Sequence, residues 1–153
     1  MTAVADTPRP GGGEQSSLRG EPFVFPVRVY YEDTDAAGVV YYANYLKFME
    51  RARTEWLAAI GMPLAELEAA HGIVFVVTHA DITFRGPARL GDRLDVSVEP
   101  QEIGASRIEL HQVVRCGKED LVTAQVEIAC VNTATFRPVR IPEPVIAKIG
   151  KKT

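Results

Sequence analysis

This sequence has little excess of one charge over the other, only two cysteines and no long apolar run. The formal net charge is only -3, so no basic excess points to nucleic acid or to an anionic membrane surface. The two cysteines, Cys116 and Cys130, each lie in an apolar run, which is typical of buried free thiols. No run approaches the roughly 18 apolar residues of a membrane span, so we predict a cytoplasmic protein with no stable membrane insertion.

The N-terminal segment also lacks the features of an ordered or targeting sequence. It contains three consecutive glycines, Gly11–Gly13, but no apolar stretch of the length that a signal peptide requires. A chain of 153 residues fits one domain. We therefore predict a disordered tail over residues 1–20 and a single domain over residues 21–153.

Strand-like and helical patterns succeed one another in the domain. Aromatic and β-branched residues predict a first strand from Phe23 to Tyr31, with Pro26 marking a sheet edge or a bulge. Apolar residues at helical spacing follow, with Asn44 as a candidate cap. We expect helices at Asn44–Ile60, Leu64–Ala70 and Val145–Ile149, and further strands at Ile73–Phe84, Arg93–Glu99, Ser106–Arg115 and Leu121–Val131.

This order of elements predicts an α+β fold in which a long helix is wrapped by a curved, five-stranded, mainly antiparallel sheet. The short connections between the last four strands, such as Pro100–Gly104 and Cys116–Asp120, suit antiparallel neighbours. Such wrapping leaves an edge strand and the far sheet face uncovered, so we expect at least a dimer.

The segment from Glu32 to Gly38 is the strongest candidate for chemistry. It places acidic residues just before a helix, where free backbone N–H groups can polarise a carbonyl group. Asp35 is the candidate carboxylate, and the neighbouring tyrosines are expected to shield it from water. The same acids could instead form a solvated turn, a helix cap or a cation site, although no further ligands cluster nearby.

Several spaced motifs resemble the 4-hydroxybenzoyl-CoA thioesterase family, in particular its bacterial branch associated with the Tol-Pal envelope system. They cover the chain from about Pro26 to Pro142. The matching residues are Arg28-Val29, Thr34-Asp35, Ala37-Gly38, Val39-Val40-Tyr41, Asn44-Tyr45, Glu50–Glu55 and Pro87–Asp92.

This resemblance implies a hotdog fold that hydrolyses an acyl-CoA thioester without a metal or redox cofactor. It gives Asp35 the role of nucleophile or general base, and the residues leave both roles open. It gives the backbone N–H of Tyr42 the role of stabilising the oxyanion. The Tol-Pal branch commonly has histidine where this chain has Tyr42, as in the aryl-CoA branch.

The remaining candidate residues would bind the substrate. Gly38 would allow close backbone approach, and Tyr41 would line the pocket. The strand residues Val76, Val77 and Thr78, followed by His79, would line the acyl pocket of a neighbouring subunit. Arg85 and Arg89 could pair with the phosphates of CoA, since guanidinium groups bind phosphate in a bidentate manner.

The predicted partners are acyl-CoA, acyl carrier protein as a second candidate, and further copies of the chain in a homodimer or a homotetramer. A hotdog dehydratase is a second enzyme hypothesis, but it needs a histidine on the long helix, which has none. A non-catalytic module that binds acyl-CoA or acyl carrier protein is the alternative from another class.

Overall fold

The computed structural model describes residues 21–150, so the predicted disordered tail over residues 1–20 lies outside the described residues. One antiparallel sheet holds all five strands in the order β1-β3-β4-β5-β2. The strands are β1 (Phe23–Arg28), β2 (Ile73–Phe84), β3 (Arg93–Ile103), β4 (Arg107–Cys116) and β5 (Glu119–Asn132).

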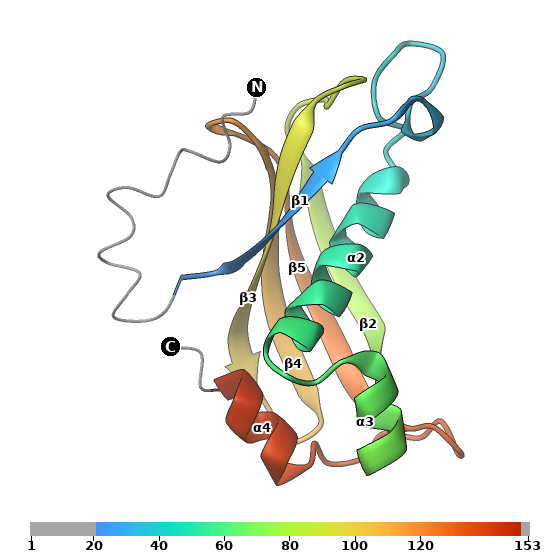
Figure 1. Ribbon diagram of the computed structural model, residues 1–153, viewed down its shortest axis with the longest axis vertical. Helices are drawn as coiled ribbons and strands as arrows, with labels where there is room; N and C mark the ends of the chain where they lie inside the picture. Colours follow the sequence, from blue (N-terminus) through green and yellow to red (C-terminus); the bar gives the residue numbers. More distant parts are fainter. Residues whose placement is uncertain (1–20, 151–153) are drawn as a thin grey trace.

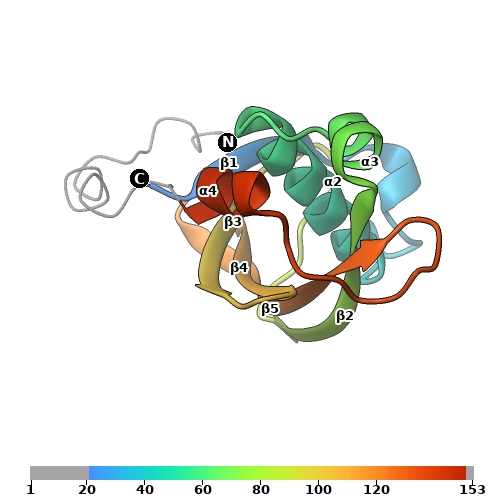
Figure 2. The same ribbon diagram turned by 90° about the horizontal axis from the view of Figure 1, so that it is seen from below.

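The long helix α2 (Asn44–Ala59) lies in the hollow of this sheet, which curves around it (Figure 1, Figure 2). Two short helices, α3 (Leu64–His71) and α4 (Glu143–Gly150), close the same end of the molecule (Figure 1). A single 3-10 turn, η1 (Tyr31–Asp33), follows β1. Within residues 21–150, no helix combines the length and the apolarity needed to cross a bilayer.

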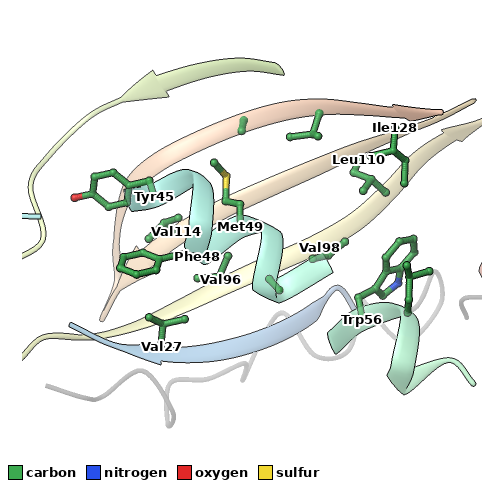
Figure 3. Packing of buried hydrophobic residues seen from close by; sticks show 14 of the residues in the cluster. Val27, Tyr45, Phe48, Met49, Trp56, Val96, Val98, Leu110, Val114 and Ile128 are labelled. Carbon is green, nitrogen blue, oxygen red and sulfur yellow. The ribbon is translucent and has the colours of Figure 1, made fainter. Parts of the chain in front are cut away.

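The core lies between α2 and the face of the sheet that it covers. Phe48 and Met49 are almost fully buried on α2, and in Figure 3 they lie over Val96 and Val114 of the sheet. Trp56 is 4% exposed near the end of the helix. Phe48, Met49 and Trp56 therefore belong to the core.

The predicted α+β class and the helix-in-sheet arrangement are confirmed, and Pro26 does lie on an edge strand. Two strand predictions were wrong in extent. β1 ends at Arg28 because Tyr31–Asp33 winds into the 3-10 turn. β3 continues to Ile103 because a register shift between Pro100 and Glu102 absorbs the proline without ending the strand.

The expectation that Asn44 caps α2 was also wrong. The cap position is occupied by Ala43, without a side-chain bond to the helix, and Asn44 is already helical. Its side-chain Nδ2 instead donates a hydrogen bond of 2.9 Å to the backbone oxygen of Asp33. Asn44 thus ties the start of the helix to the acidic segment before it.

Candidate active site

The acidic segment forms a tight turn that presents the side chain of Asp35. Thr34 and Val40 pair as an antiparallel bridge, and the backbone N–H of Asp35 donates to the oxygen of Val39 at 2.9 Å. The Asp35 Oδ1 accepts the N–H of Ala37 at 2.9 Å. One carboxylate oxygen is therefore fixed by the turn itself, which orients the group.

Gly38 makes this turn possible through its backbone conformation. Its φ angle is +81°, and a Cβ built at this position meets nothing within 4 Å. Glycine is favoured here because other residues rarely adopt a positive φ, and no neighbouring atom of the described chain excludes a side chain.

The turn is attached to the loop between β2 and β3. Val39 and Arg89 form an antiparallel bridge, and the N–H of Val40 donates to the oxygen of Ala88 at 2.9 Å. The position of Asp35 is therefore set by the sheet as well as by the helix. It also brings the backbone of Arg89 next to the catalytic candidate.

Tyr42 lies between this turn and the first helical residue. Its amide donates to no acceptor among residues 21–150, whereas the amide of Tyr41 donates to the oxygen of Asp33 at 3.1 Å. An unpaired N–H at the start of a helix carries a partial positive charge. This donor is available to a ligand.

Four aromatic rings gather beside the start of α2. The Tyr42 ring lies 5.1 Å from that of Tyr41 and meets the ring of Phe84 edge to face at 5.9 Å. The ring of Tyr45 is also 5.9 Å from Phe84. Tyr41, Tyr42 and Phe84 are 49%, 60% and 47% exposed, so they offer an apolar surface to a ligand.

Phe84 was missed by the sequence analysis, which singled it out only as a strand end. An aromatic residue that closes an apolar strand usually belongs to the core. Its role in the cluster depends on the approach of β2 to the start of α2, a contact between distant segments that no local pattern reveals.

Tyr45 joins the cluster to the loop after β2. It is 3% exposed, and its hydroxyl accepts the backbone N–H of Ala88 at 3.0 Å. Burial raises the pKa of Tyr45, an effect that the bond from Ala88 partly opposes and the charge of Asp92 adds to. The hydroxyl therefore stays protonated and can also donate.

The shielding of Asp35 by tyrosines is not found in the single chain. Asp35 is exposed, and Tyr45 faces the core rather than the turn. The cation-site alternative gains no support either, because the Asp33 Oδ2 accepts the N–H of Tyr30 at 2.9 Å. Among the residues described, no three acidic, histidine or cysteine side chains are arranged to hold a metal ion.

The predicted substrate-binding residues lie in two places. Arg89 is exposed beside the turn, and Arg85 is exposed at the end of β2, where its Nη2 lies 3.4 Å from the Thr123 hydroxyl. The group Val76–Thr78 lies earlier on β2, about 20 Å along the strand from Phe84. Within one chain, the structure does not bring that group to Asp35.

The helix wrapped by an antiparallel sheet and the position of the acidic turn define the class of hotdog thioesterases. Residues 29–149 match the family model described as the thioesterase-like superfamily. The chain belongs to this superfamily, and the predicted family and fold are confirmed.

Known relatives agree with this assignment. The chain is 42% identical over 125 residues to the acyl-CoA thioesterase YbgC of Haemophilus influenzae, covering 82% of this chain and 92% of that one. It is 37% identical over 120 residues to the 1,4-dihydroxy-2-naphthoyl-CoA hydrolase of Thermosynechococcus vestitus, covering 78% and 82%. A crystal structure of a probable thioesterase from Bartonella henselae superposes with a TM-score of 0.76 at 37% identity, covering 80% of this chain and all of that one.

Proposed function

We propose that this protein hydrolyses an acyl-CoA thioester to a free acid and CoA, with Asp35 as the reacting carboxylate. The observation that carries the proposal is the arrangement of the turn. An oriented, exposed carboxylate precedes, by seven residues, an unpaired helix-start N–H at Tyr42, beside exposed aromatic rings. The names of the relatives, acyl-CoA thioesterase and 1,4-dihydroxy-2-naphthoyl-CoA hydrolase, support the same reaction.

Two routes are compatible with this carboxylate. As a nucleophile, Asp35 adds to the thioester carbonyl, the C–S bond breaks, and CoA leaves as a thiolate that takes up a proton. Water then hydrolyses the resulting mixed anhydride. As a general base, Asp35 removes a proton from a water molecule that attacks the carbonyl directly. In both routes the oxyanion accepts a hydrogen bond from the backbone N–H of Tyr42. The partial positive charge of this N–H complements the negative charge of the oxyanion.

The cationic side chains near the turn would bind the CoA portion. The backbone of Arg89 is held beside Val39, while its exposed guanidinium has no partner among residues 21–150. Its backbone N–H donates to the Asp92 Oδ2 at 2.8 Å, which fixes the base of the side chain. We assign Arg89 and Arg85 to the phosphates, and Gly38 and Tyr41 to the region around the thioester.

The second half of the proposal concerns assembly. β2 has only β5 as a neighbour, and its residues Val77–Asp81 are exposed. We propose that two copies join through β2 as a homodimer in the cytoplasm, with Val76, Val77 and Thr78 lining the second copy's acyl pocket. Pairs of dimers could form the homotetramer, and acyl carrier protein remains a second candidate carrier of the acyl group.

The test is the release of free thiol from a panel of short, long and aromatic acyl-CoAs. Asp35→Asn keeps the size and the Oδ1 acceptor of the side chain, so the turn should persist while hydrolysis falls by at least about 100-fold. Asp120→Asn, which weakens an ion pair with Arg115 on a distant hairpin, is the control and should retain activity. Undiminished hydrolysis by Asp35→Asn would reject the assignment, and binding without thiol release by the wild type would favour a non-catalytic module.

A further inference from the structure

The two reacting groups of the candidate site lie on different segments of the chain. Asp35 belongs to the turn that the Thr34–Val40 bridge closes, and Tyr42 lies just before the start of α2. A reaction that uses the carboxylate of one and the backbone N–H of the other depends on how these segments are joined. The side chain of Asn44 lies at this junction.

One backbone oxygen, that of Asp33, accepts two hydrogen bonds from the start of the helix. The N–H of Tyr41 donates to it at 3.1 Å, and the Nδ2 of Asn44 donates to it at 2.9 Å. The two donors flank Tyr42 in the chain, and the N–H of Asn44 also bonds to the oxygen of Tyr41 at 2.8 Å. The segment that carries the Tyr42 N–H is therefore attached to Asp33 on both sides.

Asp33 is in turn a fixed part of the acidic segment. Its N–H donates to the oxygen of Tyr30 at 2.9 Å, and its Oδ2 accepts the N–H of Tyr30 at 2.9 Å. Asp33 is also only two residues before Asp35 in the same tight turn. A displacement of the Asp33 carbonyl relative to the helix would therefore displace the Asp35 carboxylate as well.

The bond from Asn44 differs from the other bonds that hold the turn. The N–H of Val40 attaches the turn to Ala88 of the loop after β2, and not to the helix. Among residues 21–150, no other side-chain hydrogen bond joins the segment 31–40 to α2. Asn44 is half-buried, so its bond is partly shielded from competition with water.

We propose that Asn44 is a positioning residue for thioester hydrolysis, and that its amide sets the separation and the orientation of the Asp35 carboxylate and the Tyr42 N–H. Asn44 acts through the Asp33 carbonyl and does not touch the reacting atoms. The inference rests on the proposed function, in which both groups meet one thioester carbonyl. A misplacement of reacting groups by about 1 Å can lower a rate by about 100-fold, so this bond matters for turnover.

Steady-state kinetics of Asn44→Ala on an acyl-CoA that the wild type hydrolyses tests this role. Alanine removes the donor and is a strong helix former, so α2 should persist. We expect kcat to fall by about 10- to 100-fold. KM should stay within about twofold of the wild type, because alignment of the reacting groups matters in the transition state more than in binding. An unchanged kcat would overturn the inference.

Asn44→Asp is a second variant with the same shape as the native side chain. Its ionised carboxylate cannot donate to the Asp33 oxygen, whereas its negative charge is favourable at the start of a helix. A role limited to helix stability would therefore spare this variant, and a positioning role predicts a loss of kcat in both. A loss in Asn44→Asp alone would result from the added charge near the oxyanion and would overturn the inference.

Asn132→Ala is the matched control, because Asn132 also organises a turn through its side chain. Its Oδ1 accepts the N–H groups of Ala134 and Thr135 at 2.8 and 3.0 Å. Figure 1 shows this orange-red connection after β5 at the opposite end of the molecule from the acidic turn. The control should keep the kcat and the KM of the wild type. A fall in its kcat equal to that of Asn44→Ala would reflect a general loss of stability and would overturn the inference.

Hydrogen exchange measured by mass spectrometry gives a second readout, without substrate. The segment 33–42 should exchange faster in Asn44→Ala than in the wild type or in Asn132→Ala, and equal exchange would overturn the inference. The failures of the two proposals are distinguishable. Activity that is lost in Asp35→Asn but undiminished in Asn44→Ala would overturn the positioning role and leave the proposed function intact. A wild type that releases no thiol from any acyl-CoA would reject both.

Discussion

Arg53 Nη1 of α2 donates a hydrogen bond of 3.0 Å to Oε1 of Gln112, the one buried polar side chain of the described core. The Nε2 of Gln112 in turn lies 3.2 Å from the backbone oxygen of Met49 and 3.3 Å from that of Ser97. Burial lowers the pKa of Arg53, and Glu50 partly offsets this effect. The amide of Gln112 thus fixes α2 at one position along the sheet.

Replacing Gln112 should therefore destabilise the fold. Gln112→Leu leaves the half-buried guanidinium of Arg53 without its acceptor, and we expect the free energy of unfolding to fall by about 2 kcal/mol. Urea denaturation measures this change. Gln101→Leu, on an exposed position of β3, is the control and should change stability by less than about 0.5 kcal/mol. Equal effects of the two substitutions would contradict the role of Gln112.

The hydroxyl of Tyr45 offers a second test, because it links α2 to the loop after β2. Tyr45→Phe keeps the ring against Phe84 but removes the acceptor of the Ala88 N–H. We expect a loss of about 1 kcal/mol in the free energy of unfolding and faster hydrogen exchange in the loop, measured by mass spectrometry. Tyr31→Phe, at a position that is 82% exposed, should have neither effect.

The buried thiol of Cys130 leads us to expect that the stability of the fold depends on pH. Burial raises the pKa of its thiol from 9.0 to about 11. In the unfolded chain this thiol therefore loses its proton at a lower pH than in the folded chain. Stability is unaffected below pH 9.0, and it falls by about 2 kcal/mol as the pH rises from 9.0 to about 11.

The contribution of Cys130 can be separated from those of other groups by substitution. Denaturation over this pH range should show a shallower loss for Cys130→Ala than for the wild type. Burial also raises the pKa of Cys116, and Cys116→Ala should remove a smaller part of the loss because this thiol is only half-buried. Parallel curves for Cys130→Ala and the wild type would show that the thiol titrates alike in both states.

The left-handed backbone conformation of Phe136 leads us to expect that glycine at this position stabilises the fold. Phe136→Gly removes the strain at φ 61°, so thermal or urea denaturation should show a gain of about 1 kcal/mol over Phe136→Ala. The comparison needs equal protein concentrations, since association of copies also contributes to apparent stability. Equal stability of the two variants would indicate that the conformation at position 136 is not strained.

The sequence predicted most of the elements, because apolar periodicity and turn residues are local signals. The helix beginning at Asn44 and the strand Ile73–Phe84 were correctly placed. The predicted end of β3 was wrong, because proline usually ends a strand. Only the register of β3 against β4 shows how Pro100 is accommodated.

The candidate site was predictable only in part. The motif around Asp35 identified the acidic turn, and Gly38 indicated that this turn is tight. The bonds of Asn44 to Asp33 and of Tyr45 to Ala88 join residues 11 and 43 positions apart, and no pattern in the sequence predicts such contacts. The conformation of Phe136 was equally hidden, because nothing about a phenylalanine after a polar turn indicates a positive φ.

The unlike edges of the sheet limit how many copies can join. β1 has six residues, and Pro26 among them has no N–H to donate to an incoming strand. β2 is twice as long and has no proline. Copies that join through β2 therefore present only β1 strands at both ends of the combined sheet. No further copy can then extend the sheet in the hydrogen-bonding direction. Pro26 therefore disfavours the open-ended addition of copies that leads to fibrils.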